Sequence, residues 1–170
     1  MKNLILSLAL AALSCGTVLA QQPEAVAPAA ATAVSVGSEI QNLQYMNDVR
    51  PAADAKFYVY LCSASWCPPC RRSMPGIVAE YPNIKAAGGE VILLCFDRTA
   101  EAGTAYVKGY NIPFAAAMTD FEAVKTLNLP GFVAPKGIPN IVIVTPSGEL
   151  LYRGHGAYLV KWKQLLEGKI

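Results

Sequence analysis

The sequence has little charge of either sign and only one histidine. Among its 170 residues, 14 are Lys or Arg, 12 are Asp or Glu, and the single histidine is His155. The opposite charges nearly cancel, and no run of Lys or Arg is long enough to form a nucleic-acid or membrane-surface footprint. The sequence therefore predicts no nucleic-acid partner.

Long hydrophobic runs are also missing after the first twenty residues. Lys2, the apolar run Leu4–Leu13 and the small residues of Val18–Ala20 form the pattern of a secretory signal peptide. The run is too short to cross a bilayer, which needs about 20 apolar residues. We expect residues 1–20 to be a signal peptide, and the mature chain to be periplasmic or secreted with no membrane span. Lipoprotein anchoring through Cys15 remains an alternative.

The next segment lacks the side chains that build a core. Residues 21–37 consist mostly of Ala, Pro, Val, Gln and Ser, which bury too little apolar surface to offset their ordering entropy. We expect a disordered linker here, followed by one folded domain at residues 38–170.

Within that domain, apolar runs typical of strands alternate with helical patterns. Strands are predicted at residues 57–62, 90–96, 140–145 and 149–153, the last two joined as a hairpin by a Pro-Ser-Gly turn, and residues 113–118 are expected to be a short strand or an extended segment. Helices are predicted at residues 67–87, 99–110, 119–127 and 158–166. The segment 38–46 fits either a helix or an edge strand. This order indicates an α/β fold with a mixed sheet flanked by helices on both faces.

Two helix signals come from particular residues. Pro75 is expected to kink the helix at 67–87, and Gly88 with the next glycine to end it. Thr119 and Glu122 have the spacing of a capping box, which predicts a helix from there to about Leu127.

The chemistry of the chain is concentrated in Trp66-Cys67-Pro68-Pro69-Cys70. If a helix starts at Cys67, the two thiols lie on the same side of its first turn, within bonding reach. The positive end of the helix favours the thiolate of Cys67. Pro68 and Pro69 have no N–H, so the backbone N–H of Cys70 becomes the expected donor to the Cys67 sulfur.

These positions predict dithiol/disulfide exchange, with Cys67 as the nucleophile and Cys70 as the resolving thiol. The thiols carry the reaction themselves, so no cofactor is implied. A bare Cys-x-x-Cys can also be half of a metal site, but no second such pair and no His-x-x-His complete one. The alternative is a module that binds or delivers copper or zinc through Cys67, Cys70 and His155. A peroxidase is not indicated, because the pattern Pro-x-x-x-Thr-x-x-Cys is missing.

The segment Tyr60–Pro75 around the motif resembles the thioredoxin superfamily. It is most similar to the extracytoplasmic proteins of the TlpA and ResA type and to the tryparedoxin and nucleoredoxin group. The resemblance covers residues 57–166. It implies a thioredoxin fold and a thiol-disulfide oxidoreductase that acts on protein thiol/disulfide substrates outside the cytoplasm and is recycled by a redox partner protein.

Two later loops carry the same resemblance. Gly137-Ile138-Pro139 matches the cis-proline loop of the family, and Gly154-His155-Gly156-Ala157 matches its last glycine turn. The resemblance implies that Trp66, Ile138, Pro139, His155 and Gly156 line a substrate groove, and that Pro139 is cis. The alternatives are a trans proline that opens a strand and a solvated His155 without function.

The sequence departs from its relatives where they keep a buried acid. Leu61 and Ser73 stand at the two positions where those relatives carry Asp or Glu, which leaves the direction of electron flow open. If Leu61 pairs with Leu93, alternation along the strands turns Cys62 and Cys95 to opposite faces of the sheet. We then expect two buried free thiols and not a second disulfide.

Overall fold

The computed structural model describes residues 35–170. The predicted signal peptide, Cys15 and most of the predicted linker lie outside the described residues. The elements are α1 (Val36–Ile40), β1 (Phe57–Ser63), α2 (Pro68–Ala86), β2 (Gly89–Cys95), α3 (Ala100–Gly109), β3 (Ala115–Met118), η1 (Ala123–Lys125), β4 (Asn140–Val144), β5 (Leu150–His155), η2 (Gly156–Lys161) and α4 (Trp162–Leu165).

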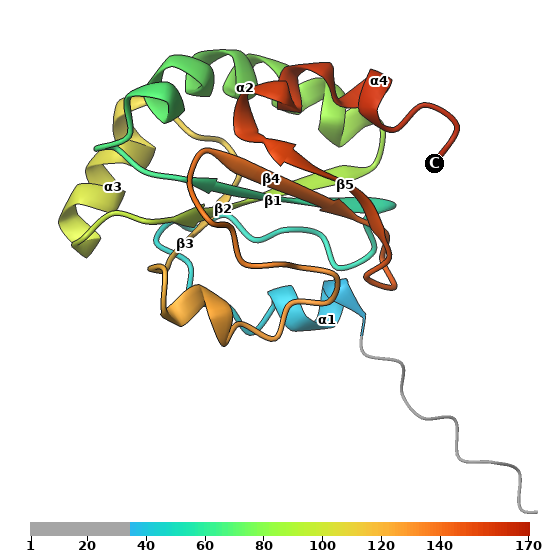
Figure 1. Cartoon of the computed structure of the whole chain (residues 1–170), viewed down its shortest axis with the longest axis horizontal. Coiled ribbons are helices and arrows are strands. Elements are labelled where there is room, and N and C mark those ends of the chain that lie inside the picture. The colour runs from blue at the N-terminus through green and yellow to red at the C-terminus, as the bar shows by residue number, and fades with distance from the viewer. Residues whose placement is uncertain (1–34) are drawn as a thin grey trace, which may run out of the picture. The chain divides into compact units, whose positions relative to one another are not determined.

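One mixed sheet forms the centre of the domain (Figure 1). Its strand order is β3-β2-β1-β4-β5, with β1, β2 and β3 parallel and with β4 and β5 antiparallel to their neighbours. Every residue of β1 and β2 is buried, as expected for apolar strands covered on both faces. The four predicted strands are therefore confirmed, and β3 lies within the segment 113–118.

Helices cover both faces of the sheet. On one face, α2, α3, η2 and α4 pack over a cluster that contains Leu61, Ile84 and Trp162. On the other face, α1 and η1 pack over a second cluster that contains Ile40 and Val124. Figure 1 shows α2 and α4 together on one side of the sheet and α1 on the opposite side. The predicted fold class, a mixed sheet flanked by helices on both faces, is confirmed.

The helix that follows the motif is close to its predicted extent. It continues without interruption across Pro75 and Pro82, and Cys67 is its N-cap. The chain leaves it through Gly88, whose φ of 86° lies in the left-handed region that glycine adopts without a steric penalty. From there it turns directly into β2.

The folded part begins earlier than predicted. Val36 and Gly37, assigned above to the linker, are buried in α1. The Ser35 hydroxyl accepts the N–H of Ser38 at 3.2 Å, and the Val36 N–H donates to the Pro146 carbonyl at 2.9 Å. The boundary between residues 37 and 38 is therefore wrong by at least two residues, because this short turn is stabilised by tertiary contacts that a local pattern does not reveal.

The segment 38–46 combines both conformations considered for it. Its first residues belong to α1, and Tyr45 further along makes an isolated antiparallel bridge to Ala117 of β3.

The capping box predicted at Thr119 is wrong. Thr119 instead extends the sheet edge, where its N–H donates to the Cys95 carbonyl at 2.8 Å. Asp120 Oδ1 accepts the N–H groups of Glu122 and Ala123, both at 2.7 Å, and so closes the turn ahead of η1, whose N-cap residue Glu122 makes no side-chain cap hydrogen bond. Only the single 3-10 turn η1 follows, in place of a helix to Leu127.

The last predicted helix is also different in form. The segment 158–166 is expected as one helix, but the chain forms the 3-10 helix η2 and then the short α4. Leu159, Trp162 and Leu166 are nevertheless buried against the core.

Candidate active site

The motif cysteines are joined at the start of α2. Cys67 and Cys70 form a disulfide with their Cα atoms 5.2 Å apart. Cys67 is 3% exposed and Cys70 is fully buried. The backbone N–H of Cys70 donates to Cys67 Sγ at 3.3 Å, which confirms the predicted donor.

The local sequence explains this placement. Strand β1 delivers the chain to Cys67, and Pro68 and Pro69 occupy the first helical positions, where a missing N–H costs nothing. Because the two prolines have no N–H and the Arg71 N–H donates to the Cys67 carbonyl, the Cys70 N–H is the donor left for the Cys67 sulfur, and together with the helix dipole it favours negative charge at the N-cap. A thiolate at Cys67 is stabilised there when the disulfide is reduced.

A second loop, which leads into β4 next to β1, lies against the motif. The peptide bond between Ile138 and Pro139 is cis, as the resemblance implied. The Ile138 carbonyl oxygen lies 3.7 Å from Cys67 Sγ. The Gly156 N–H donates to the Pro139 carbonyl at 3.1 Å, and a Cβ on Gly156 would lie only 2.7 Å from Pro139 Cβ. The structure therefore brings Cys67, Ile138, Pro139 and Gly156 together, and this close approach requires glycine.

Trp66 lies beside this group with much of its ring in solvent. Its side chain is 49% exposed, while its indole N–H donates to the Phe96 carbonyl at 2.9 Å. Phe96 in turn packs against Phe121, with ring centroids 4.8 Å apart. A half-exposed aromatic ring next to a redox pair offers apolar contact area to a bound chain.

His155 has other contacts. Its Nδ1 accepts the N–H of Ala157 at 3.3 Å and so caps η2, and its ring lies 6.0 Å from that of Tyr158. The exposed imidazole thus holds the turn that positions Gly156, and its described contacts do not include the cysteines.

Sequence reasoning missed Asp97. This residue follows β2 and is only 4% exposed. Its carboxylate accepts the backbone N–H of Ser65 at 3.0 Å, the Ser65 hydroxyl, and the thiol of Cys95 at 3.1 Å. Its position in the sequence is an available signal. The motif follows β1 and Asp97 follows β2, and because these two strands are parallel, their carboxyl ends lie next to each other.

Leu61 and Ser73, which stand at the two positions where the resemblance implies an acid, make contacts within the sheet and within α2. Leu61 pairs with Leu93 across β1 and β2, as expected. The Ser73 hydroxyl donates within its own helix to the Cys70 carbonyl at 3.0 Å.

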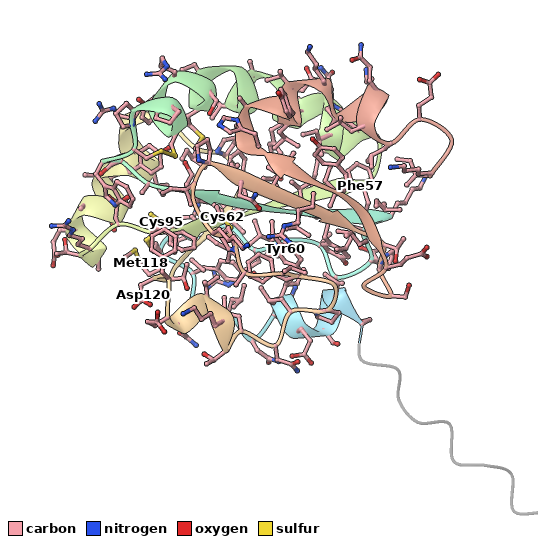
Figure 2. All side chains as sticks on the ribbon, in the orientation of Figure 1. Phe57, Tyr60, Cys62, Cys95, Met118 and Asp120 are labelled. Atoms are coloured by element: carbon pink, nitrogen blue, oxygen red, sulfur yellow. A yellow bond between two sulfur atoms is a disulfide. The ribbon has the colours of Figure 1, made fainter. Side chains whose placement is uncertain are left out.

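Cys62 and Cys95 are buried free thiols, as predicted. They belong to the clusters on opposite faces of the sheet. Figure 2 labels both residues on the ribbon. Burial raises the pKa of each thiol to about 12. Both remain protonated and unreactive at neutral pH, which leaves the motif as the reactive pair among the described cysteines.

Two further properties concern only residues 35–170. In that range no helix has the length and apolar character needed to cross a membrane. Nor does any group of three or more His, Cys, Asp or Glu side chains there have the arrangement of a metal site.

Comparison with known proteins shows the family to which this chain is related. The family model described as thioredoxin-like matches residues 54–150, which is more than half of the chain. The chain belongs to the thioredoxin-like family. Among curated relatives of this thioredoxin-like chain, nucleoredoxin of Xenopus laevis is 36% identical over 93 residues, covering 54% of this chain and 22% of nucleoredoxin. The thiol-disulfide oxidoreductase ResA of Bacillus cereus is 29% identical over 104 residues, covering 61% of this chain and 56% of ResA.

Solved structures agree with the family assignment. Tryparedoxin II of C. fasciculata has a TM-score of 0.52 and 28% identity, covering 68% of this chain and 75% of that one. A thiol:disulfide interchange protein of Chlorobium tepidum has a TM-score of 0.51 at 22% identity, covering 63% of this chain and 79% of that one, and shows the shared fold. The thioredoxin-like chain spans about a fifth of nucleoredoxin and about half of ResA. The predicted resemblance to both branches of the superfamily is confirmed.

Proposed function

We propose that the protein is a thiol-disulfide oxidoreductase that exchanges electrons with protein substrates through Cys67 and Cys70. The observation that carries the proposal is the position of Cys67 Sγ, which caps a helix, lies 3.3 Å from the N–H of Cys70, and lies 3.7 Å from the Ile138 carbonyl oxygen. The nucleophilic sulfur of Cys67 therefore lies next to the resolving Cys70 and next to a backbone segment that can bind the substrate chain.

The exchange proceeds in two balanced steps. The Cys67 thiolate attacks one sulfur of a substrate disulfide, the substrate S–S bond breaks, and the departing substrate thiolate takes up a proton. The Cys70 thiol then loses its proton and attacks Cys67 Sγ, which releases the second substrate thiol and closes the Cys67–Cys70 disulfide. Two electrons pass to the substrate. The same steps in reverse oxidise a dithiol.

The surrounding loops support recognition of an extended chain. The Ile138 backbone beside Cys67 can hydrogen-bond a substrate strand, and the exposed ring of Trp66 gives it apolar contact. Pro139 and Gly156 hold that backbone in place, and His155 lies at the rim, where it orders the turn. Pro68 and Pro69 tune the pair, because they leave the Cys70 N–H as the donor to sulfur.

The proposed setting is outside the cytoplasm, in the periplasm or secreted. The signal pattern of residues 1–20 supports export, and the name of the relative ResA gives the same class of reaction. The proposed partners are proteins with thiols or disulfides and a second redox protein that recycles the Cys67–Cys70 pair.

Reduction of insulin by dithiothreitol tests the activity. The wild-type protein should accelerate precipitation of the insulin chains, and Cys67→Ser and Cys70→Ser should both abolish that acceleration. The matched control is Cys62→Ala, which removes a buried thiol outside the motif and should keep the activity. A folded wild-type protein that leaves the dithiothreitol rate unchanged contradicts the proposal.

A trapping experiment tests the assigned roles. Cys70→Ser lacks the resolving thiol and should accumulate clients as mixed disulfides through Cys67, whereas Cys67→Ser should not. Clients joined through Cys70 in the Cys67→Ser variant would reverse the two roles.

A further inference from the structure

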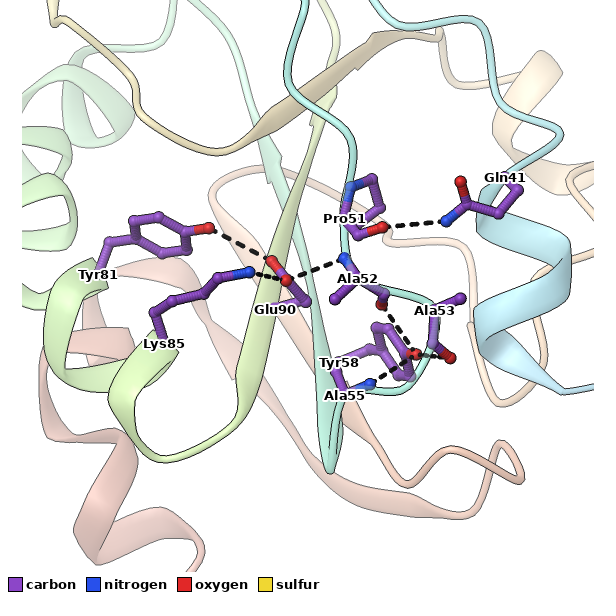
Figure 3. Close-up of polar contacts among 9 residues, drawn as sticks. All are labelled: Gln41, Pro51, Ala52, Ala53, Ala55, Tyr58, Tyr81, Lys85 and Glu90. Atoms are coloured by element: carbon purple, nitrogen blue, oxygen red, sulfur yellow. Dashed lines mark hydrogen bonds and ion pairs between the residues drawn. The ribbon is translucent and has the colours of Figure 1, made fainter.

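Two buried carboxylates lie at the two ends of strand β2. Glu90 near its start is 2% exposed and Asp97 just after its end is 4% exposed. Figure 3 shows Glu90 facing Lys85, Tyr81 and the backbone N–H of Ala52. Asp97 lies at the other end of β2, close to the motif, and its partners are the backbone and hydroxyl of Ser65 and the thiol of Cys95.

Asp97 binds the residue that stands two positions before Cys67. Its carboxylate receives both the N–H and the hydroxyl of Ser65. The carbonyl of the same residue accepts Nη1 of Arg71 at 2.9 Å. Ser65 is thus held from both sides, by a buried anion on its N–H and hydroxyl and by a cation on its carbonyl.

The neighbouring residue is tied to the same segment. Trp66 donates its indole N–H to the carbonyl of Phe96, which immediately precedes Asp97. The chain that leads into Cys67 is therefore fixed by side-chain hydrogen bonds to residues 96–97 over two consecutive residues. Hydrogen bonds to an ionised acceptor are the strong ones, so the Asp97 contacts dominate this attachment.

We propose that Asp97 is a positioning residue for the redox pair, acting through Ser65 to hold Cys67 Sγ against the N–H of Cys70. This inference rests on the proposed function and adds a residue that neither the motif nor the family comparison supplies. Asp97 acts through geometry and not as the proton acceptor, because its hydrogen bonds go to Ser65 and Cys95 and not to the motif cysteines.

Geometry and charge make opposite predictions for the pKa of Cys67. If Asp97 positions the loop, its loss moves Cys67 Sγ away from the Cys70 N–H and the helix end, so the pKa of Cys67 rises. If its negative charge acts directly on the thiolate, its loss makes the pKa of Cys67 fall.

The experiment compares Asp97→Ala and Asp97→Asn with wild type in the full chain. The readouts are the pKa of Cys67, from thiolate absorbance during pH titration, and the equilibrium of the pair with glutathione. Asp97→Ala should raise the pKa of Cys67 toward that of a free thiol and lower kcat/KM for insulin about tenfold, as expected when a reacting atom is misplaced. Asp97→Asn keeps an oxygen acceptor for Ser65 and should recover most of both losses.

Glu90→Gln is the matched control, because it neutralises the other buried carboxylate of β2, which also accepts a backbone N–H. It should lower the melting temperature while leaving the pKa of Cys67 and the glutathione equilibrium at their wild-type values. Asp97→Ala that behaves like Glu90→Gln would show a merely structural role and overturn the inference. A fall in the pKa of Cys67 in both Asp97 variants would overturn it in favour of direct charge.

Failure of the proposed function gives a different result. The pKa of Cys67 and the glutathione equilibrium belong to the pair itself and need no client protein. A wild-type protein that does not reduce insulin therefore counts against the proposed function, whereas equal values in wild type and Asp97→Ala count against Asp97 alone.

Discussion

At the scale of single residues, two tyrosines of β1 form a natural comparison. Tyr58 and Tyr60 are both fully buried and belong to the same cluster on one face of the sheet. The Tyr58 hydroxyl donates to the Ala53 carbonyl at 2.7 Å and accepts the N–H of Ala55 at 3.3 Å (Figure 3). The Tyr60 hydroxyl is buried with no hydrogen-bond partner among the described residues.

The two hydroxyl groups should therefore respond differently to removal. Tyr58→Phe should lower the free energy of unfolding by about 1–2 kcal/mol, because it leaves the buried Ala55 N–H unpaired. Tyr60→Phe should leave stability unchanged or increase it, because it removes a desolvated hydroxyl that gains nothing in the fold. Urea denaturation of both variants and of wild type measures the free energy of unfolding of each protein. A larger loss for Tyr60→Phe than for Tyr58→Phe would contradict the assignment of partners.

Single residues also show what the sequence can and cannot predict. The placement of Cys62 and Cys95 on opposite faces follows from alternation along the strands once Leu61 is paired with Leu93, a register that the family resemblance supplies, and it is correct. The role of Asp97 depends on which loop its carboxylate meets, and its partner Ser65 is separated from it by 32 positions in the chain. A pattern within a few residues does not contain that contact.

At the scale of elements, a hydrogen bond joins the last helix to α2. The indole N–H of Trp162 in α4 donates to Glu80 Oε1 at 2.8 Å, and the Trp162 ring stacks on Phe57 at 5.7 Å between centroids. The hydrogen bond from Trp162, followed by one from Asn83, lowers the pKa of the Glu80 carboxyl. The ionised form of Glu80 therefore binds α4 more strongly than the protonated form.

This contact predicts a loss of stability in acid. A carboxyl whose pKa is lowered by folding contributes stability above its unfolded pKa of about 4.3, and loses it as pH falls through the lower folded value. Because Glu80 is only partly buried and water screens its charge, the contribution should be no more than about 1 kcal/mol. Glu80→Gln keeps an oxygen acceptor but cannot titrate, so its stability should change less than that of wild type below pH 4. Thermal denaturation of both proteins between pH 3 and pH 6 measures the difference, and parallel curves would contradict the prediction.

Helices and strands were predictable where a long apolar run or a helical pattern of apolar residues marks them in the sequence. Strands β1 and β2 follow from continuous apolar runs, and the long helix α2 follows from its helical pattern and from the prolines at its start and the glycines after its end. Short 3-10 turns were not predictable, because their form depends on which nearby polar group supplies a cap. The carboxylate of Asp120, and not the expected Thr119, closes the turn ahead of η1, and the imidazole of His155 caps η2.

At the scale of the whole molecule, one sheet separates two hydrophobic clusters. Alternate residues of β1 enter each cluster, with Val59 and Leu61 on one face and Tyr60 on the other. The motif cysteines belong to the second cluster, together with Ile40 of α1. The site therefore depends on packing from both faces, since α2 is held by one cluster and its first turn by the other.

This arrangement predicts that the described domain unfolds as one unit. Ile84 of α2 and Ile40 of α1 are both fully buried, in different clusters. Truncation of either to Ala should lower the free energy of unfolding by about 2–5 kcal/mol. Because the clusters share β1, each variant should still show one transition, with tryptophan fluorescence and far-ultraviolet circular dichroism changing together. If Ile40→Ala instead gave two separated transitions, the face that holds Cys67 and Cys70 would fold independently of the face that holds Ile84, and the site would need only half of the sheet's packing to form.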